Sequence, residues 1–428
     1  MKRPVTVEDM IALIKYEFKE DPKIGAMFEK CFSNTLNTTV KPMPDGTTFV
    51  ITGDIPAMWL RHSVCQIRPY LILAQNNTEI ADLVAGLVAR QMDFIIKDPY
   101  ANAFNETDNG AGHQKDGTNM KPFIWERKYE IDSLCFPIQL SYLYWKNTKR
   151  TDIFTQDWRR AARTIIKTFR VEQDHENNSA YRFGRNNCPY TDTLSRDGKG
   201  ALVKSNIGMT WSGFRPSDDA CTYGYLVPSN MFACVILKYM ETIANEIYQD
   251  VELSTEARKL ADEIEASIMK NAILENEKYG RVFAYELDGF GQYNIMDDAN
   301  VPSLLSIPYL GFCSIDDSIY QNTRRMILSE TNPYYFEGTA FRGIGSPHTP
   351  EKYVWHISKA MEGLTSGSKQ QKLEIIQQLR TTDADTLMMH EGVFVDDPKC
   401  YTREWFSWAN AMFCELVLSY CGYEVTED

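Results

Sequence analysis

Acidic, basic and aromatic side chains gather in five short stretches of the sequence. These stretches are Gly53–His62, Trp125–Glu130, Trp211–Asp219, Phe341–His348 and His390–Phe394. Aromatic faces can stack on the C–H surfaces of sugars, and carboxylates and arginines can fork pairs of hydroxyl groups. Glycoside hydrolysis commonly uses two carboxyls, one protonated to release the leaving oxygen and one ionised to activate water or to attack the sugar. The five stretches therefore indicate a carbohydrate pocket that contains acidic catalytic groups.

Motifs of other chemistries are absent from the sequence. It contains no phosphate-binding G-x-x-x-x-G-K-[ST], no dinucleotide-binding G-x-G-x-x-G, no G-x-S-x-G serine elbow and no zinc-binding H-E-x-x-H. Its six histidines show no recognisable metal-ligand spacing. We therefore expect neither a protein-bound metal nor a cofactor.

Composition narrows the class of protein further. The 428 residues are 43% hydrophobic, 12% aromatic and 24% charged, which excludes a disordered chain. The net charge of −13 comes without a cluster of lysines and arginines, so nucleic acid and membrane surfaces are poor partners. The apolar run Met231–Leu237 is too short to span a bilayer, and no apolar core follows the basic residues at the start of the chain. Together with ten cysteines that form no C-x-x-C pair, this predicts a cytoplasmic protein with buried, reduced thiols.

Helical periodicity predicts two kinds of helix that alternate along the chain. Inner helices, apolar around most of their circumference, are expected near 56–75, 130–146, 227–247, 302–312, 350–365 and 403–421. Outer helices with one apolar stripe are expected from about Thr6 and near 78–96, 152–171, 254–273, 316–329 and 368–382. Six helices of each kind in strict alternation predict an all-α fold, an (α/α)6 barrel formed by one domain over residues 1–428.

The lengths of the connections predict where the functional site lies. Inner-to-outer links are short, whereas outer-to-inner links are long, for example 97–129 and 172–226. In a ring of antiparallel pairs all the long links fall at one end, and long loops in a compact domain usually carry function. We expect the site at the mouth formed by the N-termini of the inner helices, with short strands in the loops, such as one within 47–52.

Over nearly the whole chain, the five stretches resemble glycoside hydrolase family 125, the metal-independent exo-α-1,6-mannosidases, and most closely its bacterial cytoplasmic members. The resemblance implies an (α/α)6 barrel that hydrolyses with inversion at the anomeric carbon. It also implies that Asp218 is the general acid and Glu391 the general base. A small mannose-containing oligosaccharide, such as an N-glycan fragment, is the implied partner, and no obligate protein partner is inferred.

Each site residue also has a structural interpretation. Asp218 precedes an apolar helix and could be a cap, but the like charge of Asp219 beside it should raise one carboxyl pKa, as a general acid needs. The residues that we expect to bind substrate are Asp54, Trp59, Arg61, Glu126, Arg215, Arg342 and His348. Asp54 could instead cap a helix that begins with Pro56. The arginines could form structural ion pairs, and Trp59 could belong to the core.

Three alternative functions remain open from the sequence. A sugar epimerase on the same barrel could use paired histidines, such as His113, His348, His356 and His390. A calcium-dependent α-mannosidase would need the metal that the sequence does not predict. A noncatalytic helical scaffold gains nothing from buried acids, so it is the weakest alternative.

Overall fold

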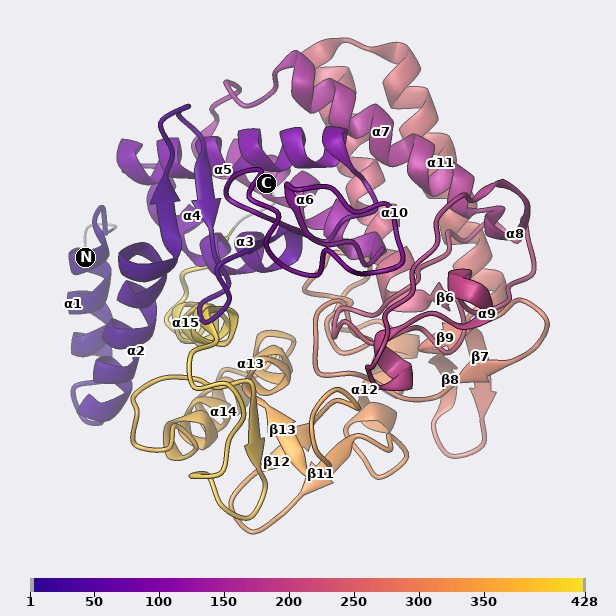
Figure 1. The fold of residues 1–428 in the computed structure, drawn as a ribbon. Helices are drawn as coiled ribbons and strands as arrows, with labels where there is room; N and C mark the ends of the chain where they lie inside the picture. Colours follow the sequence, from indigo (N-terminus) through magenta and orange to yellow (C-terminus); the bar gives the residue numbers. More distant parts are fainter. Residues whose placement is uncertain (1–3, 426–428) are drawn as a thin grey trace.

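The inner elements of the fold form a closed ring. The computed structural model describes residues 4–425. Its inner helices are α3 (Leu60–Ile67), continued by η2 (Arg68–Tyr70) and α4 (Leu71–Ala74), then α6 (Ile131–Thr148), α10 (Val227–Ile243), α13 (His356–Leu364) and α15 (Ser407–Tyr420). Helix α15 packs on α3, α3 on α6, α6 on α10, and α13 on α15 (Figure 1). The inner ring is thus built by segments from both halves of the chain.

One inner position of the ring is not a helix. Residues 302–312, expected to be helical, form a run of turns, although Leu304, Leu305 and Ile307 are as buried as an inner element requires. Pro308 cannot donate a helical hydrogen bond, and the Asp297 carboxylate accepts hydrogen bonds from the backbone N–H groups of Leu304 (2.7 Å) and Leu305 (3.0 Å). The apolar pattern was therefore right about burial and wrong about conformation.

The outer layer also differs from the expectation at the N-terminal end. The outer helices are α2 (Pro22–Asn34), α5 (Thr78–Lys97), α7 (Gln156–Glu172), α11 (Val251–Asn271), α12 (Ser318–Ile327) and α14 (Lys369–Thr381). The predicted first helix is α1 (Val7–Glu17), but it packs on α2, and it is α2 that packs on the inner helix α15. The outer partner is thus a helix that the sequence analysis did not identify.

Outer and inner helices begin in different ways. The side chains of Asn77, Thr155, Asp250, Asp317 and Ser368 cap the outer helices α5, α7, α11, α12 and α14, and that of Thr6 caps α1. The inner helices have no such cap, and their N-cap residues are Trp59, Glu130, Leu226, Trp355 and Phe406. The uncapped N-termini of the inner helices, which carry partial positive charge, point to the mouth of the ring. A group of acidic side chains at this mouth is electrostatically favoured.

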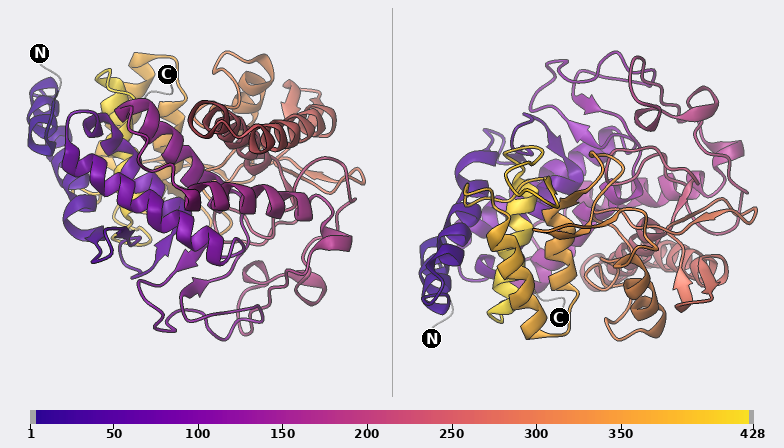
Figure 2. Two further views of the ribbon diagram at one scale, coloured as in Figure 1. Left: turned by 90° about the horizontal axis from the view of Figure 1, so that it is seen from above. Right: turned by 90° about the horizontal axis from the view of Figure 1, so that it is seen from below.

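Short strands join the long links to the inner helices. The relevant strands are β3 (Met58–Trp59), β4 (Ala103–Phe104), β5 (Ile124–Glu126), β6 (Tyr225–Leu226), β9 (Glu286–Leu287), β10 (Tyr293–Asn294), β13 (Tyr353–Trp355) and β14 (Gly392–Phe394). They form the antiparallel groups β3–β4–β5, β6–β9–β10 and β13–β14. In β13–β14, Trp355 pairs with Gly392, which places Glu391 at the start of α13. Figure 2 shows these strands and loops gathered toward one end of the helices, as expected from the link lengths.

The remaining elements lie in the links and at helix ends. They are β1 (Val40–Pro42), β2 (Thr48–Val50), β7 (Ile273–Asn276), β8 (Gly280–Phe283), β11 (Tyr335–Glu337), β12 (Arg342–Ile344), α8 (His175–Asn178), α9 (Ser195–Gly198), η1 (Thr35–Thr39), η3 (Tyr190–Asp192) and η4 (Ala244–Tyr248). Strand β2 confirms the strand expected within 47–52. The start of the expected helix 56–75 is wrong, because α3 begins at Leu60, and the helical N1 role of Pro56 falls with it.

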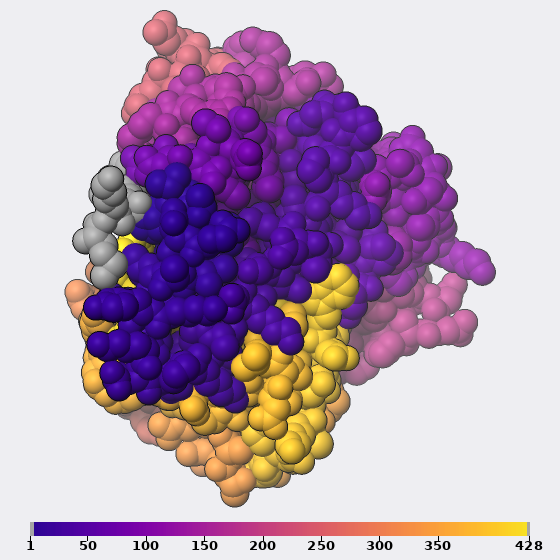
Figure 3. All heavy atoms as spheres, turned by 90° about the vertical axis from the view of Figure 1, so that its left-hand side faces the viewer, coloured from indigo at the N-terminus to yellow at the C-terminus, as the bar shows by residue number. Residues whose placement is uncertain are grey.

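The two ends of the described chain lie against each other. Lys23 Nζ is 2.8 Å from Asp383 Oδ1, Cys31 Sγ is 3.3 Å from Asn410 Oδ1, and the Thr35 and Ser407 hydroxyls are 3.1 Å apart. Figure 3 shows the indigo N-terminal segment beside the yellow C-terminal segment on one face. Within residues 4–425 no helix is both long and apolar enough to cross a membrane.

Candidate active site

Asp218 stands at the tip of a tight loop before α10. Its backbone adopts a φ of 71°, in the left-handed region that aspartate enters more readily than most residues. The loop is closed by a 2.8 Å hydrogen bond from the Arg215 N–H to the Asp219 carbonyl, and Lys128 Nζ donates to the Asp218 carbonyl at 2.7 Å. The Asp218 side chain is 27% exposed, so it is held firmly and still reachable from solvent. It does not cap α10, which begins at Val227.

Behind Asp218, one buried arginine serves several carboxyls. Arg61 Nη1 donates to Glu130 Oε2 at 2.6 Å and to Asp132 Oδ2 at 2.7 Å, and these three side chains are fully buried. Arg61 Nη2 is 3.9 Å from Asp218 Oδ1. Neither Arg61 Nη2 nor Glu130 Oε1 has a hydrogen-bond partner among the described residues. One guanidinium thus faces three carboxyls, and burying all three as anions would be costly.

The surroundings of this group shift the pKa values of Glu130 and Asp218 in opposite directions. Burial raises the pKa of Glu130 well above its usual value, and the negative charges of Asp218 and Asp132 add to this rise against the effect of Arg61. Burial also opposes ionisation of Asp218, but Lys128 and Arg61 outweigh it and lower the Asp218 pKa below its usual value. The expected rise of the Asp218 pKa beside Asp219 was therefore wrong for this structure. The two shifts have opposite directions, and they favour a proton on Glu130 over one on Asp218.

Glu391 lies in the last long link, immediately before β14. Its side chain is 8% exposed, and Arg403 Nη1 donates to Glu391 Oε1 at 3.4 Å. The same guanidinium holds Asp54, with Arg403 Nε 3.0 Å from Asp54 Oδ2 and Arg403 Nη2 in contact with the other carboxylate oxygen. Asp54, whose side chain is 39% exposed, therefore serves Arg403 and caps no helix.

His348 connects the surroundings of the two predicted catalytic carboxyls. Its Nδ1 is 3.0 Å from Asp219 Oδ1. Burial lowers the pKa of His348, but the Asp219 hydrogen bond and the charges of Asp219, Asp218 and Glu391 raise it to about 9. The His348 ring also lies 6.4 Å from that of Trp355, which pairs with Gly392, the residue after Glu391. The structure therefore brings these two carboxyls to the same part of the barrel mouth.

Glu126 lies in β5, on the Asp218 side of the mouth. It accepts a hydrogen bond from Asn102 Nδ2 at 3.0 Å and from Arg185 Nη2 at 2.7 Å. Asn102 Nδ2 also lies 3.4 Å from Asp218 Oδ1, so this one amide links Glu126 to the predicted acid. Lys128 Nζ is 3.8 Å from Glu126 Oε1 and contacts Asp192. Glu126 is 3% exposed, and its position supports a role in holding Asp218 as much as a role in binding substrate.

Comparison with known proteins decides the family. Residues 21–418 match the family model described as metal-independent alpha-mannosidase (GH125). The chain belongs to this family. It is accordingly a glycoside hydrolase of the α-mannosidase type, and the epimerase and the noncatalytic scaffold are set aside.

Individual relatives agree with the assignment to GH125. A solved α-mannosidase structure from Streptococcus pneumoniae, a non-productive substrate complex with alpha-1,6-mannobiose, is 48% identical to this chain. The alignment covers 97% of this chain and 98% of that chain, with a TM-score of 0.95. The meiotically up-regulated gene 157 protein of Schizosaccharomyces pombe is 39% identical over 96% of this chain and 85% of its own length. A bacterial glucoamylase complexed with acarbose is 14% identical, covering 98% of this chain and 59% of the glucoamylase at a TM-score of 0.58. This more distant likeness concerns the fold alone and agrees with the (α/α)6 barrel.

Aromatic side chains line the centre of this GH125 mouth. Trp59, 4% exposed, belongs to a small apolar cluster with Ala57 and Ala103 that is separate from the main core. Its ring stacks on His62 with centroids 5.7 Å apart, and His62 lies 5.0 Å from Trp408. The indole Nε1 atoms of Trp59 and Trp408 are buried without a hydrogen-bond partner among the described residues. Trp59 thus packs outside the main core, and its role in substrate binding stays a prediction.

Two of the expected sugar ligands are held by ion pairs. Arg215 is engaged by Glu286, with Nε at 2.7 Å and Nη2 at 3.0 Å from its carboxylate oxygens. Arg342 is 57% exposed and faces Glu337 on the neighbouring strand at 3.5 Å. Both thus follow the structural interpretation of an ion-paired arginine, and their part in substrate binding stays a prediction.

Sequence reasoning missed Arg403, Glu130 and Asp132. Arg403 lies just before the inner helix α15, where the other stretches also have their polar residues, so its position was a usable signal. Glu130 ends one of the five stretches, but the sequence analysis gave it no role. The partnership of Asp132 with Arg61 had no signal, because an aspartate in the first turn of a helix is ordinary.

Proposed function

We propose that this GH125 member is an exo-acting, inverting α-1,6-mannosidase that removes the non-reducing terminal mannose of small oligosaccharides. Family membership supports the glycosidase and the sugar. The α-1,6 linkage is supported by the mannobiose named for the S. pneumoniae structure. We further propose that the substrates are fragments of N-glycan cores, cleaved in the cytoplasm.

In the proposed reaction, water displaces the leaving sugar in one step. Glu391 accepts a proton from the water as its oxygen bonds to the anomeric carbon. The bond from that carbon to the glycosidic oxygen breaks, and Asp218 gives the oxygen its proton. The product is β-mannose, and inversion calls for the two carboxyls to be about 6.5–9.5 Å apart, with room for the water. The observation that carries this assignment is the position of His348, whose Nδ1 is 3.0 Å from Asp219, next to Asp218. Its ring lies 6.4 Å from that of Trp355, which pairs with Gly392, next to Glu391.

In this proposal, the proton that Asp218 gives to the leaving oxygen comes from Glu130. In the free protein the pKa of Glu130 is raised by burial, whereas Lys128 and Arg61 lower the pKa of Asp218, so Glu130 is the favoured site for a proton. A neutral sugar over Asp218 displaces water and favours the uncharged form of the carboxyl. We propose that Glu130 then passes its proton to Asp218. Arg61 stabilises the Glu130 carboxylate that this transfer leaves behind.

The deciding experiment offers α-1,2-, α-1,3- and α-1,6-linked mannobiose to the enzyme and follows the products by proton NMR. We expect cleavage of the α-1,6 isomer with β-mannose as the first product. First appearance of α-mannose would overturn the inverting mechanism, and preferred cleavage of another isomer would overturn the linkage. Activity that persists in excess EDTA separates the enzyme from a calcium-dependent mannosidase.

A further inference from the structure

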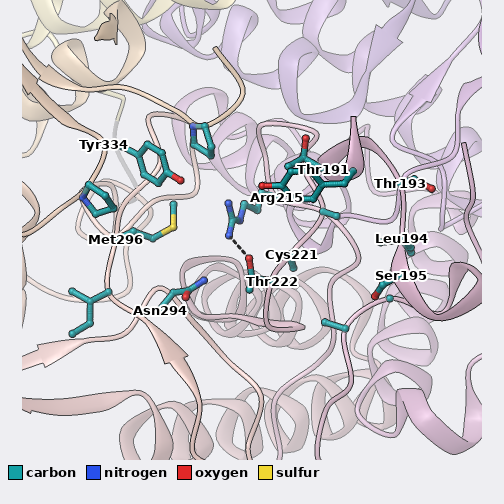
Figure 4. Close-up of a pocket in the computed structure, with 17 residues that line it drawn as sticks. Thr191, Thr193, Leu194, Ser195, Arg215, Cys221, Thr222, Asn294, Met296 and Tyr334 are labelled. Atoms are coloured by element: carbon teal, nitrogen blue, oxygen red, sulfur yellow. Dashed lines mark hydrogen bonds between the residues drawn. The ribbon is translucent and has the colours of Figure 1, made fainter. Parts of the chain in front are cut away.

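A cavity of about 480 Å³ adjoins the loop that contains Asp218, because Arg215 and Ala220 of this loop line it (Figure 4). Its wall comes from three links, 190–201, 294–296 and 333–347, and its floor contains Arg215, Cys221 and Thr222. The volume is in the range of about 300–1,000 Å³ that is usual for small-molecule sites. Neither Asp218 nor Glu391 lines the cavity.

The lining favours a neutral ligand with many hydroxyl groups. Uncharged hydrogen-bonding side chains surround the cavity, namely those of Thr191, Thr193, Ser195, Thr222 and Asn294. Arg215 is the one charged side chain among the described residues that line it, and Glu286 already holds it at 2.7 Å. A phosphate or a carboxylate would find no uncompensated cation here. A saccharide suits such a lining.

Aromatic rings stand at the edge of the cavity. Tyr190 is 89% exposed, an unusual position for a large side chain. Tyr334 lies in another link and lines the same cavity as Tyr190 and Arg215. Exposed tyrosine rings can stack on sugar rings while their hydroxyls stay solvated. The two tyrosine rings thus offer stacking surfaces for sugar rings, and the neutral side chains of the lining offer hydrogen bonds to the sugar hydroxyls.

The cavity shares its wall with the predicted general acid. Arg215 and Ala220 line it and flank Asp218 in the same loop, with the Ala220 N–H bonded to the Thr191 carbonyl at 2.7 Å. Pro347, which also lines it, precedes His348, the partner of Asp219. A general acid protonates the leaving oxygen, so the sugar beyond that oxygen must lie on the acid's side of the site. The cavity is on that side.

We propose that this cavity binds the leaving part of the substrate, a neutral oligosaccharide longer than one sugar. The inference rests on the proposed function and extends it, because it makes chain length beyond the disaccharide a determinant of specificity. Tyr190 and Tyr334 act as stacking platforms. Asn294 offers its amide oxygen as a hydrogen-bond acceptor, since its Nδ2 already donates to Glu286 at 2.8 Å.

The test compares three substrates: α-mannosyl fluoride, which has no leaving sugar, α-1,6-mannobiose and linear α-1,6-mannotriose. The wild-type kcat/KM should be higher for the trisaccharide than for the disaccharide. The variants Tyr190→Ala and Tyr334→Ala should each lose roughly three- to tenfold in kcat/KM on the trisaccharide and keep the wild-type rate on the fluoride. Tyr293→Ala is the matched control, since Tyr293 is 48% exposed next to Asn294 but does not line the cavity.

Failure of this inference and failure of the proposed function give different results. Equal wild-type kcat/KM for the two oligosaccharides, or equal losses on fluoride and trisaccharide in the variants, would overturn the inference alone. A wild-type enzyme that cleaves neither the fluoride nor mannobiose would overturn the proposed function, and the inference with it. Tyr190 is so exposed that its replacement should leave the fold intact, which a thermal unfolding curve verifies.

Discussion

Arg61 Nη1 donates a 2.6 Å hydrogen bond to Glu130 Oε2, and both side chains are fully buried behind the predicted general acid. The same nitrogen also holds Asp132, so a single cation restrains two carboxyls while its other nitrogen faces Asp218. In this arrangement the pKa of Glu130 is raised and that of Asp218 is lowered, which makes Glu130 a positioning residue whose effect is measurable.

Glu130→Gln should lower kcat/KM for mannobiose by about 100-fold at neutral pH, because the amide has no carboxyl proton to pass to Asp218. The alkaline limb of the pH profile should move to lower pH, since Asp218 would then titrate with the low pKa that Lys128 and Arg61 give it. The measurement is steady-state kinetics over about pH 4 to 9, a range that spans ordinary carboxyl and imidazole pKa values.

Asp132→Asn is the matched control for this prediction. It makes the same chemical change at the other carboxyl bound to Arg61 Nη1. If both variants shift the pH profile equally, Glu130 has only a general structural effect and no special role in protonation.

Asp218→Asn should abolish detectable hydrolysis of mannobiose but leave substantial turnover of α-mannosyl fluoride. Fluoride leaves without a full proton transfer, whereas the leaving sugar of mannobiose needs the proton. A general acid contributes about 10²–10⁴ in rate, and its loss should therefore affect only mannobiose. Rates on both substrates are compared, and an equal loss on the two would contradict the acid role.

Glu391→Gln should instead reduce turnover of both substrates by about 100-fold or more, because every displacement needs an activated water. Azide, an anionic nucleophile that needs no base, should restore activity on the fluoride and give β-mannosyl azide. The contrast with Asp218→Asn distinguishes base from acid. Azide that rescues neither variant, with an intact fold, would count against this assignment of roles.

The His348–Asp219 pair should make stability depend on pH on the alkaline side. The pKa of His348 is raised from 6.5 to about 9 in the folded protein, so the protonated imidazole stabilises the fold fully below about pH 6.5. This contribution should disappear as pH rises through about 9. Thermal unfolding of the wild type should show the loss, and His348→Gln should show a smaller decrease over the same interval. A wild type and a variant with the same pH dependence would rule out the linkage.

The sequence predicted much of the fold because its signals were local. Apolar periodicity located α6, α10 and α11, and the lengths of the links located the mouth. Residues 302–312 were misassigned because periodicity reports burial and not conformation, and here Pro308 and the Asp297 side chain determine the backbone. Residues 56–59 were misassigned because the pairing of β3 with β4 depends on a distant part of the chain.

The candidate site was predictable only in part for a similar reason. The roles of Asp218 and Glu391 were predicted from the resemblance of the surrounding sequence stretches to glycoside hydrolase family 125. The roles of Glu130 and Arg403 depend on ion pairs between segments that are far apart, such as Arg403 with Asp54. The pKa of Asp218 was predicted from its neighbour Asp219, whereas the structure shows that Lys128 and Arg61, more than 80 residues away along the chain, outweigh it.

The contacts of α2 with the last two helices have a consequence for how the protein is made. Lys23 and Asp383 are 360 positions apart, and Cys31 and Asn410 are 379 apart, so a ribosome must release almost the entire polypeptide before these contacts can form. Until then the apolar side of α2 has no cover, and a chaperone could bind it during translation. A synthesis that stops before α15 would leave α2, α3 and α13 without the inner helix against which all three pack.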